Sequence, residues 1–246
     1  MKKIFEDKRI LLINMLFLVV TFVFDICLLV THNRYVFKTI ASVLFVICGI
    51  VNFVLVYGQD KRNKLFGWFM LAGLVFACAG DILLIDFFIP GAISFAIGHV
   101  FFFIAYSMLH KINWKDLLIS LAIFAVALVV ILALPVFDYG SMLPIVIVYA
   151  FIISCMLGKA ISNFAFDKEN RGQNFIIILG SLLFFLSDLM LLFNVFSTIS
   201  DPHNIFDIIC LVLYYPAEIL LASSIYHANI KVKAENKMLS ESVDKK

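Results

Sequence analysis

Charged residues are scarce in this sequence of 246 residues. They make up 15% of the chain, whereas water-soluble domains carry about a quarter, and hydrophobic residues account for 63%. This composition excludes a nucleic-acid-binding module, a disordered chain and a disulfide-stabilised scaffold. The net charge of +2 is too small to indicate an acidic partner. The composition therefore predicts a membrane protein whose surroundings are lipid.

Cysteine motifs are also missing. The five cysteines are separated by irregular spacings inside apolar runs, and the sequence has no C-x-x-C motif and no Cys/His cluster. Neither a zinc site nor a disulfide framework is supported, so these thiols are predicted to be buried small side chains. The first apolar run is longer than the core of a signal peptide, and no cleavage site follows it.

Eight long apolar runs occupy most of the chain. A helix needs about 20 apolar residues to cross a membrane, whereas a barrel strand needs about 10. The sequence therefore predicts an all-α integral membrane protein, an eight-helix bundle forming a single membrane domain over 1–246. The residues after 226 are expected to form a polar basic tail, either a topology anchor or a binding site for anionic lipid. The predicted spans are 10–30, 38–57, 66–87, 91–109, 116–134, 141–158, 173–194 and 205–226.

Lys and Arg residues concentrate in alternate connections between these runs. Of the 19 in the chain, all but Arg34 and Lys38 fall on the side that holds both termini. Cytoplasmic loops are enriched in Lys and Arg, so both termini are predicted to be cytoplasmic. The predicted localisation is multi-pass, in the cytoplasmic membrane if the source is bacterial.

A weak internal similarity relates the third and seventh spans. Placing Asp81 over Asp188 aligns Gly73 with Gly180, and these two spans would cross the membrane in the same direction. Parallel repeats are one way to build a membrane cavity, which favours a parallel internal repeat. Leu-rich helices also resemble one another by composition alone, so both interpretations stay open.

Four carboxylic acids lie inside apolar runs: Asp25, Asp81, Asp188 and Glu218. No Lys or Arg is expected in the middle of a span to pair with them. A charged carboxylate at the bilayer centre costs about 2.5–3.5 kcal/mol on the most lenient scale. One such acid is often explained by a hydrogen bond between helices, but four at similar depth favour a functional site.

The depth of these acids predicts that they converge. Asp25, Asp81 and Asp188 lie five or six residues from the outer ends of their spans, about 9 Å along a helix. His99 and Tyr214 reach a similar level on neighbouring spans. Tyr106 shares the face of His99, and Glu218 lies one turn below Tyr214. The predicted site in the outer half of the membrane comprises Asp25, Asp81, His99, Tyr106, Asp188, Tyr214 and Glu218.

Two other chemistries fit the residues less well. A metal could be held by Asp81, Asp188 and His99, but only one His lies within the spans, so no metal is predicted. Ser187 is adjacent to Asp188 and points about 100° away from it on a helix. It therefore cannot form a nucleophile–base pair with that carboxyl.

Three stretches together resemble the lysoplasmalogenase-like (YhhN) family of eight-span membrane proteins. They are AGDILL at 79–84, GHVFFFIAY at 98–106, and FLSD at 185–188 with a closing YYPAE at 214–218. The resemblance implies hydrolysis of the vinyl-ether bond of a lysoplasmalogen or related ether lysolipid, without a cofactor. At Glu218 this chain departs from the family pattern, in which an amide is usual. The site residues that the resemblance implies are Asp81, Gly98, His99, Tyr106, Ser187, Asp188 and Tyr214.

The chemistry of vinyl-ether hydrolysis suits paired carboxyl groups. Protonation of the β-carbon forms an oxocarbenium ion, which water captures, so the reaction needs a positioned acid and a nearby anion. Glycosidases divide these roles between two carboxyl groups. Asp81 and Asp188 are predicted to form the catalytic pair, in either order. Asp25, Tyr214 and Glu218 would then hold water or tune the pair, and His99 and Tyr106 would orient the glycerol-phosphate end.

Two rival functions remain. The acids could form the proton relay of a proton-coupled transporter of lipids or small molecules. Transporter sites often use broken helices, however, and only Pro144 and Pro216 fall inside the predicted spans. An intramembrane aspartyl protease would also use two Asp residues, but the residue two before Gly80 is Cys78 and not the glycine of a G-x-G-D element.

Overall fold

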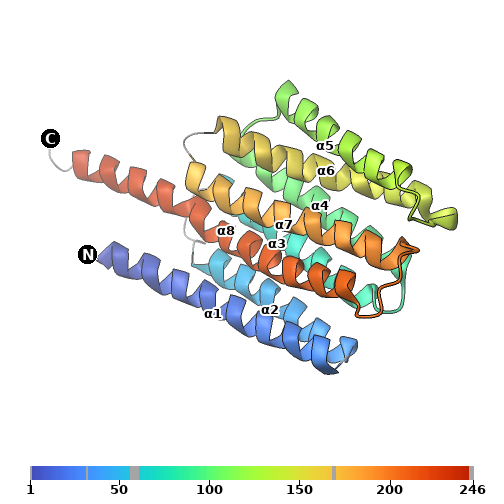
Figure 1. Ribbon diagram of the computed structural model, residues 1–246. Helices are drawn as coiled ribbons and strands as arrows, with labels where there is room; N and C mark the ends of the chain where they lie inside the picture. Colours follow the sequence, from blue (N-terminus) through green and yellow to red (C-terminus); the bar gives the residue numbers. More distant parts are fainter. Residues whose placement is uncertain (1, 32, 56–60, 168–169, 244–246) are drawn as a thin grey trace.

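The computed structural model describes residues 2–31, 33–55, 61–167 and 170–243. These residues form eight long α-helices and one short 3₁₀ helix (Figure 1). Each long helix contains an apolar stretch long enough to cross a membrane, which confirms the all-α fold and makes the chain a multi-pass membrane protein. The elements are α1 (Lys2–Thr31), α2 (Arg34–Val54), α3 (Lys61–Leu83), α4 (Phe88–Leu109), α5 (Trp114–Ala133), η1 (Gly140–Met142), α6 (Leu143–Phe166), α7 (Arg171–Phe196) and α8 (Ile205–Val243).

Helix α8 is the centre of one half of the bundle. It packs against α1, α2, α3 and α7, while α4 and α6 connect this group to α5. Among the described helices α5 packs on α6 alone, so α1 and α5 lie at opposite edges of the bundle (Figure 1). Both ends of the chain lie at the same end of the helices, as an even number of spans requires.

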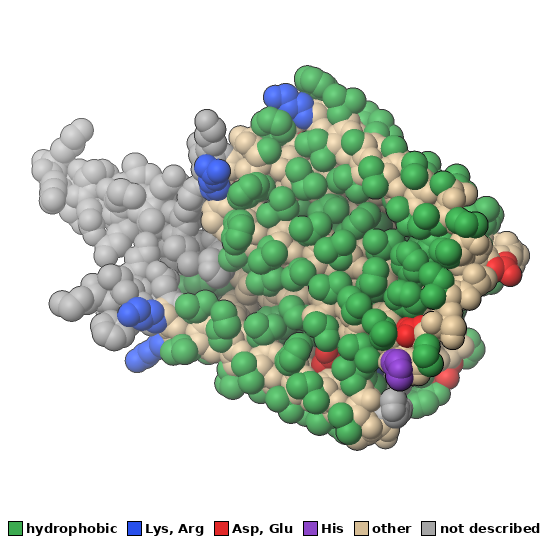
Figure 2. All heavy atoms as spheres, viewed as in Figure 1, with side chains coloured by type: hydrophobic (Ala, Val, Ile, Leu, Met, Phe, Trp, Pro, Cys, Tyr) green, Lys and Arg blue, Asp and Glu red, His purple; other side chains and the backbone are tan. Residues whose placement is uncertain are grey.

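Apolar side chains cover the outside of the bundle as well as its core. The face seen in Figure 2 is almost entirely hydrophobic, as a surface in contact with lipid should be. On this face the Lys and Arg side chains lie toward the end of the bundle that holds the chain termini, and the Asp and Glu side chains lie toward the opposite end. We call these the terminal end and the acidic end. The cytoplasmic placement of the terminal end stays a prediction.

Two helix boundaries differ from the prediction in ways that affect buried charges. Helix α3 ends at Leu83 because the chain turns over 84–86, where Phe87 N donates to Leu83 O. Asp81 therefore lies only two residues from the end of α3. Helix α2 begins before residue 38, so Lys38 lies one turn inside a helix and is buried.

Helices α6 and α8 are longer than their predicted spans. Helix α6 continues through Lys159, which was expected in a connection and instead lies fully buried inside the helix. Pro144 lies in the first turn of α6, where the missing N–H costs no helical hydrogen bond. In the described part of the chain, Pro216 is the proline that lies in a helix interior. The helical backbone of α8 extends through much of the predicted tail.

The connections at the acidic end are joined to each other. The α5–α6 and α7–α8 connections form an isolated β-bridge between Phe137 and Ser197, next to a hydrogen bond from Thr198 N to Val136 O (2.7 Å). The α7–α8 connection also holds the start of α8, because Asp201 accepts a hydrogen bond from Phe206 N (2.9 Å). This backbone N–H lowers the pKa of the Asp201 carboxyl below its usual range.

All five cysteines lie in described parts of the chain and are free thiols. Cys48 and Cys210 are buried, as predicted, while Cys27, Cys78 and Cys155 are half-buried between helices and the lipid-facing surface.

Candidate functional site

A polar cavity of about 140 Å³ opens at the acidic end of the bundle. It lies among α2, α3, α4, α7 and α8, and the remainder of its wall is apolar. Four of the predicted site residues line it: the two predicted catalytic carboxyls, Asp81 and Asp188, together with Ser187 and Tyr214. The polar side chains that line it are Lys38, Asp81, Ser187, Asp188, Asn194, Asp207 and Tyr214.

Asp81 has three partners in this cavity. Lys38 Nζ lies 3.2 Å from Oδ1, while Ser42 Oγ and the Tyr214 hydroxyl donate to Oδ2 at 2.6 and 2.7 Å. Ser42 follows Lys38 by four residues, so one face of α2 presents both groups to the carboxylate. The expectation that no cation pairs with an intramembrane acid is wrong for Asp81. It failed because a lysine near a helix end can extend its head group along the helix to a buried partner.

Asp188 is held by a different set of donors. The Tyr149 hydroxyl donates to its Oδ2 at 2.6 Å, and His99 Nε2 lies 3.3 Å from the same oxygen. His99 Nε2 is also 3.0 Å from the Tyr149 hydroxyl, so the three side chains form a compact triangle. The ring of Phe184 packs against both His99 and Tyr214, with centroids 4.6 and 5.2 Å away, and fixes their orientation.

Tyr149 was not identified from the sequence, because its run carries no motif. One signal could have found it. Tyr149 lies six residues after Leu143, the start of α6, which places its Cα atom about 9 Å from the acidic end of that helix. That depth equals the level at which the acids were expected to converge.

Ser187 has a structural contact at the cavity wall. Its Oγ donates to Cys210 O at 2.9 Å, which ties α7 to α8 beside Asp188. At the outer rim, Asn194 Nδ2 donates to Asp207 Oδ1 at 3.3 Å. Asp207 lies in the first turn of α8, near the start of the predicted span 205–226.

Four of the predicted site residues do not line the cavity. His99 reaches it only through its contact with Asp188, and Tyr106, Asp25 and Glu218 lie elsewhere. The Tyr106 hydroxyl lies 2.9 Å from Ser181 Oγ, nearer the terminal end, and its backbone carbonyl accepts a hydrogen bond from Asn163. Asp25 and Glu218 are fully buried, and none of their carboxyl oxygens has a hydrogen-bond partner in the described part of the chain. A charged carboxylate without a partner is very costly there, so their surroundings favour the neutral acid.

Gly98, another position implied by the resemblance, contributes to helix packing. A Cβ atom at this position would lie 3.1 Å from Gly73 O, so glycine lets α4 approach the backbone of α3 closely. This close approach brings His99, the next residue, toward the cavity.

Apolar pockets meet the polar cavity at Asp188. One of about 60 Å³ lies between α4, α6 and α7, and one of about 130 Å³ lies between α5, α6 and α7. Tyr149 and Asp188 line both of them, and Asp188 also lines the polar cavity. The Asp188 carboxyl thus lies at the boundary between a polar and an apolar space.

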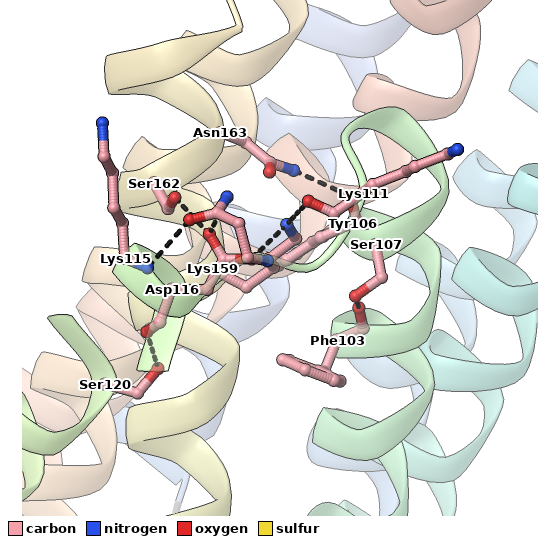
Figure 3. A network of polar contacts seen from close by, with 11 residues as sticks. Phe103, Tyr106, Ser107, Lys111, Lys115, Asp116, Ser120, Lys159, Ser162 and Asn163 are labelled. Atoms are coloured by element: carbon pink, nitrogen blue, oxygen red, sulfur yellow. Dashed lines mark hydrogen bonds and ion pairs between the residues drawn. The ribbon is translucent and has the colours of Figure 1, made fainter. Parts of the chain in front are cut away.

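A second buried polar network lies at the terminal end (Figure 3). Asp116 on α5 forms an ion pair with Lys159 on α6 at 2.7 Å and accepts a hydrogen bond from Ser162. Asp116 also caps α5 by accepting from Asn113 N, and Lys159 donates to Lys111 O. Asp116, Lys159 and Ser162 each have a partner, which is typical of a structural connection between two helices.

The fold and the cavity define a multi-pass helical membrane protein with a carboxylate-lined chamber at one end. Among the described residues, no group of three or more His, Cys, Asp and Glu side chains is placed to hold a metal ion. The chain belongs to the YhhN family, whose sequence profile matches residues 33–225. Comparison with curated proteins and with solved structures gives no significant match.

Proposed function

We propose that this protein hydrolyses the vinyl-ether bond of lysoplasmalogens, or of a related ether lysolipid, to a fatty aldehyde and a glycerophospho-base. Membership of the YhhN family, a lysoplasmalogenase-like family, supports this class of reaction. The observation that carries the proposal is the position of Asp188 between the polar cavity and the apolar pockets. A lysoplasmalogen is likewise polar on one side of its vinyl-ether bond and apolar on the other, because this bond joins a polar head to a hydrocarbon chain.

Asp188 is the proton donor in this proposal. Its Oδ2 accepts from Tyr149, whereas its Oδ1 has no hydrogen-bond donor in the described part of the chain. A proton on Oδ1 is therefore available to the β-carbon of the vinyl ether. A correctly placed general acid contributes about 10²–10⁴-fold to a reaction rate.

Asp81 is the anion. Lys38, Ser42 and Tyr214 all donate to it, and each of these contacts stabilises the ionised carboxylate. A fixed anion close to the reacting bond stabilises the positive charge of the oxocarbenium ion. The two carboxyl groups, which the sequence did not distinguish, thus have separate roles.

The reaction consumes one water molecule. Asp188 Oδ1 transfers its proton to the β-carbon, and the carbon attached to the ether oxygen becomes the oxocarbenium centre. The resulting Asp188 carboxylate then accepts a proton from water as the water oxygen bonds to that carbon. When the hemiacetal collapses, the bond to the glycerol oxygen breaks as Asp188 donates its proton to that oxygen. The hemiacetal hydroxyl gives its proton to Asp188 as the aldehyde forms, which restores the acid. His99 and Tyr149 hold the Asp188 carboxyl in position through these proton transfers.

Aldehyde release from a lysoplasmalogen by the detergent-purified protein tests the proposal, with the saturated alkyl-ether analogue as substrate control. Asp188→Asn and Asp81→Asn should each lower kcat at least a hundredfold without unfolding the protein. Asp86→Asn is the matched control, because Asp86 lies at the same end on the surface and accepts from Tyr35 instead. Full activity in both cavity variants would overturn the proposal.

A proton-coupled transporter is the alternative, and the buried unpartnered carboxyls of Asp25 and Glu218 favour it. Such groups can bind and release protons within a membrane. Proton-dependent uptake into vesicles by a folded protein that releases no aldehyde would select this function.

A further inference from the structure

The apolar pocket between α5, α6 and α7 is not explained by the chemistry at Asp188. Its volume is about 130 Å³, and apart from Tyr149 and Asp188 every residue that lines it is aliphatic or aromatic. Ala127 and Val130 of α5, Ile153 of α6 and Phe185 of α7 form much of its wall.

This pocket leads away from the polar cavity toward the middle of the bundle. Ile153 lies one helical turn beyond Tyr149 on α6, about 6 Å farther from the acidic end, and Phe185 lies nearly one turn beyond Asp188 on α7. A ligand that extends from the cavity past Asp188 therefore passes from a polar cavity into a pocket lined by apolar side chains.

The outer wall of the pocket is open to lipid. Helix α5 packs on α6 alone, and α5 and α7 line the pocket together without packing against each other. A hydrocarbon chain can reach the pocket from the bilayer between these two helices. The wall residues contributed by α5 are aliphatic, so a chain that enters along this helix meets an apolar surface.

A larger groove of about 310 Å³ between α4 and α6 does not have this relation to the site. Tyr149 contacts it, but Asp188 does not line it. A chain lying there would not place its first carbons beside the carboxyl group.

We propose that the pocket between α5, α6 and α7 binds the hydrocarbon segment of a single-chain lipid next to the bond that is cleaved. The inference rests on the proposed function for the identity of that bond. The polar head of the lipid lies in the cavity that contains Asp81 and Lys38, and the distal part of the chain continues into the bilayer between α5 and α7.

Two alanines on the pocket and the groove provide a matched test. Ala127 lines the pocket and Ala96 lines the α4–α6 groove, and both are half-buried. Ala127→Phe should lower kcat/KM for a lysoplasmalogen at least tenfold, whereas Ala96→Phe should change it less than twofold. Val130→Phe repeats the test at a second position of the same wall. The reverse ranking of the two alanine variants would overturn the proposal.

Cross-linking tests the pocket without requiring hydrolysis. The probe is a saturated alkyl-ether lysolipid with a photoreactive diazirine on the third or fourth carbon of its chain, added to the wild-type protein. We expect labelled peptides from α5, α6 and α7 around Val130, Ile153 and Phe185, and a loss of labelling in Ala127→Phe. Labelling of α4 instead would overturn the proposal. If the probe labels the pocket but the protein releases no aldehyde, the hydrocarbon-binding role of the pocket is supported and the proposed hydrolase activity is rejected.

Discussion

At the scale of single residues, Asp81 and Asp188 show how neighbours give similar side chains different chemistry. Both are aspartates near the acidic end, but Asp81 has a cation within 3.2 Å and Asp188 has a tyrosine and a histidine. A buried ion pair with added hydrogen bonds retains its charges. Asp188 instead contacts one hydroxyl group and one imidazole ring, both through the same carboxyl oxygen.

Tyr149→Phe tests the contact that holds Asp188. The substitution keeps the ring that packs against His99 but removes the hydroxyl group 2.6 Å from Oδ2. A hydrogen bond to a charged group is worth about 1.5–3 kcal/mol, so we expect kcat for aldehyde release to fall about tenfold to a hundredfold. KM should change little, since the aromatic wall of the pocket remains.

A stability measurement on the same variant separates positioning from folding. The melting temperature in detergent should stay close to that of the wild type, and the pH dependence of kcat should shift. An unchanged kcat and pH profile would show that Tyr149 does not position the acid.

At the scale of elements, α5 depends on one neighbour. It contacts α6 alone, and the ion pair between Asp116 and Lys159 connects the two helices at the terminal end (Figure 3). Near the acidic end, Ile131, Val146 and Ala150 form a small apolar cluster between them. These three residues also line the proposed hydrocarbon pocket, so the shape of the pocket depends on how α5 is attached to α6.

Lys159→Met should weaken the first attachment. The change leaves the buried Asp116 carboxylate without its cation, which typically costs about 3–5 kcal/mol. We expect a large loss of thermal stability in detergent, measured by a cysteine-reactivity or fluorescence melt. Lys111→Met is the control, because the Lys111 side chain is exposed and only its backbone carbonyl contacts Lys159.

The double variant Asp116→Asn/Lys159→Met tests the reason for the loss. Removing both charges should recover part of the stability, because no isolated charge remains buried. A single Lys159→Met variant as stable as the wild type would mean that the pair contributes nothing to the attachment of α5.

At the scale of the whole molecule, charge is distributed unevenly between the two ends. Lys and Arg side chains lie near the terminal end and acidic side chains toward the other end (Figure 2). The rule that cytoplasmic loops carry more Lys and Arg then predicts that the candidate site opens to the non-cytoplasmic side.

Labelling of single added cysteines in intact cells tests this orientation. Ser200→Cys, in the exposed α7–α8 connection, should react with a membrane-impermeant maleimide, whereas Lys111→Cys at the terminal end should react only after the cells are opened. The native cysteines are buried or half-buried, and the labelling of the unmodified protein measures their background reaction with the maleimide. The opposite labelling pattern would show that the site faces the cytoplasm.

Much of the architecture could be predicted from the sequence because it depends on local properties. Each apolar run is long enough to satisfy its backbone as a helix within lipid, so the eight helices and their approximate ranges follow from hydrophobicity. The acids at Asp81 and Asp188 were also recognisable, since a carboxyl group is costly in an apolar run wherever the run lies in the bundle.

The tertiary structure alone decided which polar groups meet. Lys38 and Asp81 are 43 positions apart and Tyr149 and Asp188 are 39 apart, so neither pair leaves a signal in local spacing. Helix packing also separated Tyr106 from the cavity, although it lies on the same helical face as His99. Hydrophobicity determines that a segment crosses the membrane, but the contacts of a side chain depend on the rotation and neighbours of its helix, which are set by packing over the whole bundle.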